Sequence, residues 1–353
     1  MFEDSDETEA NNEYIAVVYV NAMERLREAT LAVTYNCNLR CSMCNIWKVS
    51  DFEELAPEEY GKLPNSLRSI NITGGEPFLR RDLVEVVRSI HEVVPGCRIV
   101  ISSNGFMTDR IVSAMAEMKR FHAKLGIGVS VDGLEVVHDS VRGVKGAFGK
   151  AIETVKAVEA EGVEDVRIGM TIVKENSGQI LDVYRLSGEL GAEFTTTVAH
   201  NSDVYFRKND NAPVETLLGV DRDLRRISDA HLRKLSPKAW FRAYHIAGIT
   251  DRSIRSSSTG LCTAGTRFIF MDPRGDVYPC IVLNKVIGNI REFDSLEAML
   301  STKEAKAARS IVRACEKDCW MVCNTRNMML GHPGRSIGWV IRNKPRAHLS
   351  RPL

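Results

Sequence analysis

The feature that most constrains the fold is a plan that repeats six times between residues 29 and 199 of the 353-residue chain. Each repeat has a short apolar run, often β-branched, then a polar loop and a helix-like spacing of apolar residues. In one repeat Leu83, Val86, Val87 and Ile90 recur at i, i+3, i+4 and i+7, which places them on one face of a helix. The six runs are 31–35, 69–72, 98–102, 126–131, 167–173 and 194–199.

Strands that alternate with crossover helices predict a parallel sheet, and six such units suit a partial (β/α)6 TIM barrel of the α/β class. Ligands of such a barrel gather at the carboxyl ends of its strands. Polar motifs follow four of the predicted strands, at residues 36–44, 73–77, 103–105 and 132–133. We therefore expect these motifs to form one shared site.

The chain has nine cysteines, and eight of them fall into two groups. We expect a cytoplasmic protein, whose thiols are kept reduced, so the groups indicate metal sites. Cys37, Cys41 and Cys44 offer three thiolates where a cubane iron-sulfur cluster usually takes four, which leaves one iron open. Zinc is the alternative, but a closed zinc site needs a fourth ligand, and no His or Cys lies close by in sequence.

This three-cysteine pattern resembles the signature of the radical S-adenosylmethionine (SAM) superfamily. The resemblance implies a catalytic 4Fe-4S cluster whose open iron binds SAM, and a SAM site built from the polar motifs. Thr73-Gly74-Gly75-Glu76-Pro77 is similar to the segment that receives the methionine amino group, and glycines there allow a close approach of the backbone. The implied SAM contacts are Met43 on the adenine, Gly74, Gly75, Glu76, Ser103, Asn104, Ser130, Asp132, and Arg142 near the carboxylate.

The second cysteine group resembles the auxiliary-cluster module called SPASM, or its shorter form, twitch. Its members are Cys262, Cys280, Cys315, Cys319 and Cys323. Five cysteines are fewer than a full two-cluster module has, so we expect one auxiliary 4Fe-4S cluster, with one cysteine to spare. A zinc site is the alternative here. The ninth cysteine, Cys97, stands alone beside a predicted strand and is expected to be a small buried residue.

These motifs divide the chain into five expected regions. They are an acidic arm (1–28), the radical SAM partial barrel (29–200), a connector (201–260), a small α+β auxiliary-cluster domain with a β-hairpin (261–330) and a basic tail (331–353). A helical pattern in the connector includes Leu224, Ile227 and Leu235, and residues 272–276 have the composition of a hairpin turn. The tail mixes apolar residues with arginines, which suits peripheral contact with an anionic membrane, although a packed or frayed terminus is the simpler account.

Composition and charge exclude several functional classes. The net charge is +1, which gives no electrostatic case for nucleic acid, and no apolar run is long enough to span a membrane. By its resemblance the chain is expected to cleave SAM reductively to a 5′-deoxyadenosyl radical that abstracts hydrogen from a substrate, with the auxiliary cluster assisting electron transfer.

Several partners and functions stay open. The electron donor would be a flavodoxin or ferredoxin, and the substrate a small molecule, a saccharide, a lipid-linked intermediate or a ribosomally made peptide. Only about thirty residues precede the expected barrel, so a recognition domain of the kind found in peptide-modifying relatives is not expected. Non-enzymatic alternatives are an iron-sulfur electron carrier, which would need no SAM pocket, and a zinc-stabilised binding protein.

Overall fold

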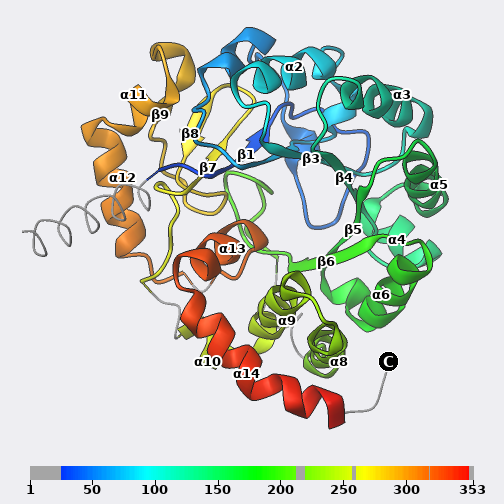
Figure 1. The fold of residues 1–353 in the computed structure, drawn as a ribbon. Coiled ribbons are helices and arrows are strands. Elements are labelled where there is room, and N and C mark those ends of the chain that lie inside the picture. The colour runs from blue at the N-terminus through cyan, green and yellow to red at the C-terminus, as the bar shows by residue number, and fades with distance from the viewer. Residues whose placement is uncertain (1–24, 212–218, 257–259, 318, 350–353) are drawn as a thin grey trace, which may run out of the picture.

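A computed structural model describes residues 25–211, 219–256, 260–317 and 319–349. The side chains of Ser256 and Cys323 also lie outside the described part. The described residues form a curved sheet with helices around its outer side (Figure 1).

The sheet has nine strands in the order β6-β5-β4-β3-β2-β1-β7-β8-β9. The first six are parallel to their neighbours, as the repeated plan predicted. Each overlaps one of the predicted runs, with ends shifted by up to three residues. The six are β1 (Glu28–Ala32), β2 (Ser69–Thr73), β3 (Arg98–Ser103), β4 (Leu125–Ser130), β5 (Asp165–Ile172) and β6 (Glu193–Val198).

Amphipathic helices lie on the outer side of the sheet, and all of them except the helix at 135–142 bury their apolar stripes against it. They are α2 (Leu83–Val93), α3 (Thr108–Lys119), α4 (Glu135–Arg142), α5 (Ala147–Ala160) and α6 (Ile180–Glu189). The first crossover differs, because the described residues between β1 and β2 form only the short 3₁₀ helices Ile46–Lys48 and Pro57–Lys62. This crossover carries the first three cysteines. The fold is thus the predicted partial barrel.

The region expected to be a connector contains substantial helices of its own. These are α8 (Asp221–Arg233), α9 (Pro237–Thr250) and the short α10 (Arg252–Ser256), and α9 contacts β6. Leu224 and Ile227 are buried in α8 as expected, but the inclusion of Leu235 was wrong. It lies between the helices and is 92% exposed, because Ser236 caps α9 and Pro237 begins it.

The predicted hairpin extends the barrel sheet. Its strands β7 (Phe268–Met271) and β8 (Asp276–Tyr278) are antiparallel, and β9 (Gly288–Asn289) follows β8. Strand β7 pairs in parallel with β1, so the auxiliary region is continuous with the barrel. The remaining helices are α11 (Leu296–Leu300), α12 (Lys303–Arg313), α13 (Val322–Gly331) and α14 (Pro333–Leu349), which runs along the lower edge in Figure 1.

Candidate SAM and iron-sulfur site

The loop after β1 and the loops after β2, β3 and β4 line one cavity of about 720 Å³ that is open to solvent. These loops meet because the carboxyl ends of parallel strands lie on the same edge of the sheet. Of the site residues predicted for this half of the chain, those that line the cavity are Cys37, Cys41, Met43, Cys44, Gly74, Gly75, Ser103, Asn104, Ser130 and Arg142.

The three cysteines are mostly enclosed by protein, which favours their neutral thiols. Burial raises the pKa of Cys37 to about 11 and that of Cys44 to about 12, and it raises the pKa of Cys41 as well. Iron must therefore displace protons to bind here. Two groups already favour the thiolates, because the backbone N–H of Ile46 donates to Cys44 Sγ (3.4 Å) and Arg142 Nη1 donates to Cys41 Sγ (3.8 Å).

Close backbone contact holds the cysteine loop against the glycine segment. The N–H of Gly75 donates to the carbonyl oxygen of Thr34 (2.8 Å), and the N–H of Glu76 donates to that of Asn36 (2.8 Å). A Cβ on Gly75 would lie 2.1 Å from the Asn36 carbonyl oxygen, and one on Gly74, whose φ is +146°, would lie 2.3 Å from that of Thr34. Only glycine fits at either position, as the motif predicted.

Glu76 and Asp132, the two predicted carboxylates, are not among the residues that line the cavity. Glu76 is fully buried and accepts hydrogen bonds from Ser103 Oγ (2.9 Å) and from the backbone N–H groups of Asn104 (2.7 Å) and Phe78 (3.2 Å). Burial raises its pKa to about 7. Its carboxylate thus joins the loops after β2 and β3.

Asp132 is also fully buried, and its Oδ2 lies 2.6 Å from Arg142 Nη2. Its other oxygen accepts from the backbone N–H of Thr171 (2.8 Å). Burial raises the pKa of Asp132, whereas the facing carboxylate and Cys41 raise that of Arg142 against the effect of burial. Arg142 therefore lines the cavity as a cation held between a carboxylate and a cysteine sulfur.

Sequence reasoning missed several residues of the cavity wall, among them Trp47, Thr171, Tyr205 and Phe206. Thr171 is the last residue but one of β5, so a search for hydroxyl residues near the strand ends, of the kind that selected Ser130 in β4, would have found it. Trp47 donates from Nε1 to the Cys44 carbonyl oxygen (2.9 Å). Tyr205 and Phe206 come from the loop after β6, which has no recognisable motif.

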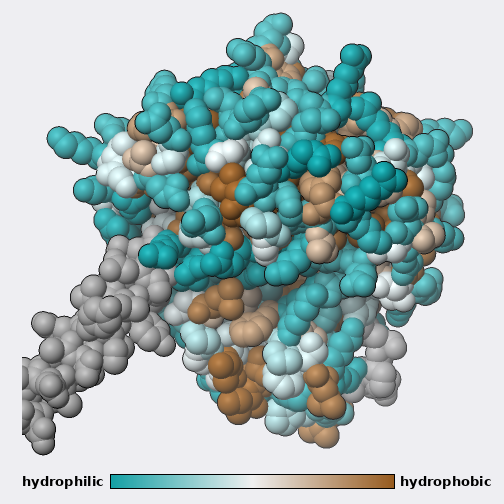
Figure 2. All heavy atoms as spheres, turned by 45° about the horizontal axis from the view of Figure 1, so that its top comes forward, coloured by the Kyte–Doolittle hydropathy of each residue, from teal (hydrophilic) through white to brown (hydrophobic). Residues whose placement is uncertain are grey.

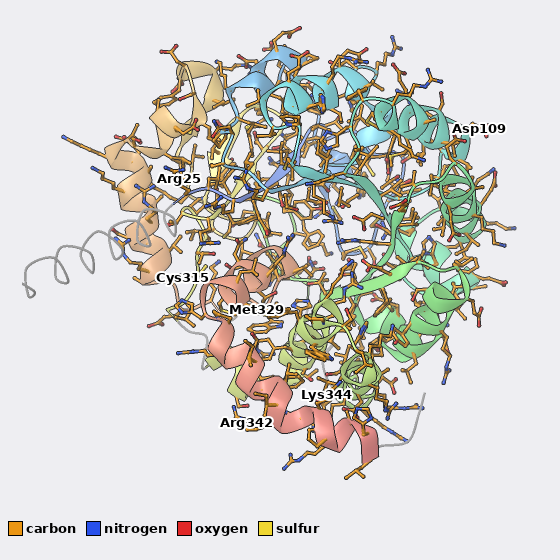
Figure 3. The ribbon with its side chains drawn as sticks, viewed as in Figure 1. Arg25, Asp109, Cys315, Met329, Arg342 and Lys344 are labelled. Carbon is orange, nitrogen blue, oxygen red and sulfur yellow. The ribbon has the colours of Figure 1, made fainter. Side chains whose placement is uncertain are left out.

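The second cysteine group gathers at one end of the extended sheet. Cys262 precedes β7, Cys280 follows β8, and Cys315 and Cys319 follow α12, as Figure 3 shows for Cys315. Burial raises the pKa of Cys319 to about 12, and the negative charges of Cys280, Cys262 and Cys315 act in the same direction. These four sulfurs therefore lie within electrostatic reach of one another. The fifth member, Cys323, has its backbone in α13, but its side chain lies outside the described part.

Both groups have the donor chemistry of iron-sulfur ligands, which are thiolates stabilised by N–H donors. In the second group the backbone N–H of Leu283 donates to Cys280 Sγ (3.2 Å). Within the described ranges, no three His, Cys, Asp or Glu side chains converge closely enough to hold one metal ion. A cubane cluster does not need such convergence, because each cysteine binds a different iron atom. Its ligands therefore surround the cluster instead of meeting at one ion.

One segment, residues 199–211, touches both cysteine groups. On the barrel side, the Phe206 carbonyl oxygen accepts from the N–H of Asn45 (2.8 Å), and the Tyr205 hydroxyl lies 2.9 Å from Thr73 Oγ1. On the other side, Ser202 Oγ donates to the Ile281 carbonyl oxygen, and Tyr205 packs in an apolar cluster with Cys280. None of the described helices combines the length and hydropathy that a membrane span requires.

Comparison with known proteins agrees with this arrangement. Residues 31–187 match the family described as the radical SAM superfamily, and residues 262–324 match SPASM, an iron-sulfur cluster-binding domain. The AdoMet-dependent heme synthase of Oleidesulfovibrio alaskensis is 26% identical over 74% of this chain and 71% of its own length. The mycofactocin maturase MftC of Mycolicibacterium smegmatis is 28% identical over 71% of this chain and 63% of its own length.

Solved structures show the same fold. SuiB of Streptococcus suis, bound to S-adenosylmethionine, has a TM-score of 0.64 at 15% identity and covers 95% of this chain and 82% of its own. The anSMEcpe protein with bound AdoMet has a TM-score of 0.54 at 14% identity and covers 90% of this chain and 99% of its own. With its two cysteine groups placed as described, the chain is an enzyme of the radical SAM superfamily with a SPASM domain, and its cofactors are SAM, a 4Fe-4S cluster and an auxiliary iron-sulfur cluster.

Proposed function

We propose that this enzyme cleaves SAM reductively and abstracts hydrogen from a substrate held in the same cavity. One observation carries the proposal: three cysteines, two obligatory glycines and the polar ends of β3 and β4 line a single cavity. When bound, the cluster and SAM supply a 5′-deoxyadenosyl radical, which is chemistry that no side chain can provide. A reducing protein such as a flavodoxin or ferredoxin would deliver the electron.

The residues of the chain would bind and orient SAM. We assign Cys37, Cys41 and Cys44 to the cluster and the exposed backbone of Gly74 and Gly75 to the methionine amino group. The hydroxyl and amide groups of Ser103, Asn104 and Ser130 suit the ribose and methionine oxygens, and Met43 would pack on the adenine. Arg142 would contribute positive charge near the carboxylate. Glu76 and Asp132 would act through their neighbours, by fixing the loop after β3 and the Arg142 guanidinium.

The auxiliary cluster would assist electron transfer to or from the substrate. Cys262, Cys280, Cys315 and Cys319 are its proposed ligands, and Cys323 is the fifth candidate. The position of residues 199–211 supports this role, because the Tyr205 ring lines the SAM cavity and also packs in the cluster that includes Cys280. A substrate against Tyr205 would therefore lie between the two iron-sulfur sites.

For the substrate class we propose a peptide. The relatives divide between tetrapyrrole and peptide chemistry, as in the heme synthase and the sporulation killing factor maturation protein of Bacillus subtilis. Porphyrin precursors carry several carboxylates, whereas Arg142 is the one cationic side chain among the described residues that line the cavity, and it is already paired. Aromatic and hydroxyl groups on the rest of the wall suit a less charged ligand.

The activity is tested by anaerobic reconstitution, reduction with dithionite and quantification of 5′-deoxyadenosine. Wild type should produce it, and the Cys37→Ala/Cys41→Ala/Cys44→Ala variant should not. Cys97→Ala is the matched control, because Cys97 is buried beside β3 and is not part of the cavity wall. Equal production by wild type and the triple variant would refute the assignment.

The substrate class is tested separately with deuterated candidates. Deuterium should move into 5′-deoxyadenosine from a deuterated peptide pool and not from a deuterated porphyrin precursor. Transfer from the porphyrin alone would reject a peptide substrate and leave the proposed SAM cleavage intact.

A further inference from the structure

The C-terminal helix α14 has an outer face that the fold does not use. Its inner face packs on α8 and α9 through Ser336, Val340 and Ala347, which are all buried. Lys344 fixes the helix further, because its ammonium group donates to the Leu232 carbonyl oxygen and lies over the Trp240 ring at 4.7 Å. The opposite face is therefore free to contact something else.

That outer face has an apolar stripe. Ile337 is 50% exposed and Ile341 is 67% exposed, and they lie one helical turn apart with Gly334, Gly338 and Pro345 around them. Two further leucines protrude nearby. Leu349 is 89% exposed at the end of the helix, and the exposed Leu235 follows the Lys234 carbonyl that Lys344 also contacts. Figure 2 shows hydrophobic side chains gathered at the lower end of the molecule, where α14 lies in Figure 1.

A line of arginines runs along the other edge of the exposed face, about 140° around the helix axis from Ile337 and Ile341. Arg335, Arg342 and Arg346 are spaced at i, i+7 and i+11, so they share one side of the helix, and α14 contains no acidic residue. All three are exposed. None of them forms an ion pair with another residue in the described ranges, and Figure 3 shows Arg342 on the outer side of the helix. The basic side therefore has no ion-pair partner among the residues that the structure describes.

We propose that α14 lies on an anionic membrane surface, with its apolar stripe in the headgroup boundary and its three arginines on acidic lipid headgroups. The charge requires an anionic partner, and an apolar stripe flanked by arginines is the pattern of an interfacial helix. The stripe is a convex ridge with protruding side chains, which a fluid surface accommodates more readily than a rigid protein groove. The helix would thus bring the barrel to the membrane without crossing it.

The test is co-sedimentation of the full-length, cluster-loaded protein with sucrose-filled vesicles. Neutral phosphatidylcholine vesicles are compared with vesicles that also contain phosphatidylglycerol, at low and high salt. Wild type should bind the anionic vesicles at low salt at least tenfold more tightly than the neutral ones, and high salt should weaken this binding. Free phosphate or glycerol phosphate at the same headgroup concentration should not compete, because neither presents an apolar boundary.

Two variants separate the components of binding. Arg335→Gln/Arg342→Gln/Arg346→Gln should lose the preference for anionic lipid, and Ile337→Ser/Ile341→Ser should weaken binding at every salt concentration. The matched control Arg81→Gln/Arg120→Gln/Lys156→Gln removes the same charge from exposed positions elsewhere on the molecule and should bind as wild type does.

Several results would overturn the proposal. Binding that the control triple reduces as much as the α14 triple would show a nonspecific charge effect. If wild type fails to sediment and α14 cross-links to the acidic residues 1–13, the exposed face of α14 binds the N-terminal arm of the same chain instead of a membrane. A failure to sediment together with a dimer that Ile337→Ser/Ile341→Ser dissociates would assign it to a second copy.

Discussion

At the scale of single residues, the site depends on buried charges that stabilise one another. Arg142 touches Cys41, faces Asp132 and is itself part of the cavity wall. A buried ion pair adds little net stability over an apolar pair, but loss of one partner leaves the other charged and desolvated. The arrangement therefore keeps a cation beside the cysteines at the cost of sensitivity to mutation.

We expect Arg142→Ala to reduce the free energy of unfolding by about 3–5 kcal/mol, because Asp132 then remains buried without its partner. The double variant Arg142→Leu/Asp132→Leu should lose less, since it removes both charges. Urea denaturation of the metal-free proteins measures both. Arg185→Ala is the control, because Arg185 is half exposed and pairs with the equally exposed Asp182, so its loss should cost about 1 kcal/mol or less. Equal losses for the single and double variants would contradict the account.

At the scale of elements, the glycine segment after β2 sets the position of the cysteine loop. Gly75→Ala would force its Cβ into the Asn36 carbonyl, and the residue that follows Asn36 is the first cysteine. We expect the reconstituted variant to lose most of the iron, sulfide and visible absorbance of the first cluster. Gly96→Ala is the control, because a Cβ there meets nothing within 4 Å. Full iron content in Gly75→Ala would show that the cysteine loop can move without loss of the cluster.

The sequence predicted those parts of the fold that depend on residues close together in the chain, through apolar periodicity and turn composition. The six barrel strands follow from apolar runs that repeat with a constant plan, and the hairpin follows from the turn residues 272–276. The parallel pairing of β7 with β1 was not predictable in this way, because it joins residues about 240 positions apart whose complementarity leaves no local signal. The same limit hid α9, whose burial depends on neighbours from β6 and α14.

The candidate site was predictable where a residue type is required and unpredictable where only position matters. Cysteines and glycines have no substitutes in their roles, so Cys37 and Gly75 were identified from sequence. Carboxylates can either bind a ligand or hold a loop, and the direction of a side chain decides between these roles. Glu76 was expected at the SAM amino group, and in the structure its carboxylate accepts hydrogen bonds from Phe78 in its own segment and from Ser103 and Asn104 in the loop after β3.

At the scale of the whole molecule, the two cysteine groups should load independently although the sheet is continuous. The variant with Cys262, Cys280, Cys315, Cys319 and Cys323 all changed to Ala should retain about four iron atoms of one cubane, against about eight in wild type. SAM cleavage without substrate should persist in it, because none of the four cysteines whose side chains the structure describes, Cys262, Cys280, Cys315 and Cys319, lines the SAM cavity. Equal iron content in both proteins, or zinc in the second site when iron is plentiful, would reject the proposed ligands.

Stability of the whole molecule should fall as the pH is lowered below 6.5. Burial lowers the pKa of His138 and His231 to about 3 and that of His245 to about 4. Between these values and 6.5 the unfolded chain binds more protons than the folded one, so each such histidine removes about 1.4 kcal/mol per pH unit. Carboxyls whose pKa burial raises act in the opposite direction, because they favour the folded state as they are protonated; they are Glu76, at about 7, and Asp132, Glu28 and Asp272. Burial also lowers the pKa of His200, to about 4, and that of His122, so five histidines stand against these four carboxyls.

His231 offers a direct test of this balance. Neither of its ring nitrogens has a hydrogen-bond partner in the described part of the chain, and its ring meets the Tyr184 ring edge-on at 5.8 Å. A phenylalanine can make the same aromatic contact without binding a proton. The free energy of unfolding, measured by urea denaturation of the metal-free protein at several pH values, should therefore fall less steeply below pH 6.5 in His231→Phe than in wild type. The difference between the two slopes should correspond to about one proton. The exposed His332 is the control, and His332→Phe should keep the wild-type slope, whereas parallel slopes for wild type and His231→Phe would mean that His231 is already protonated in the folded protein.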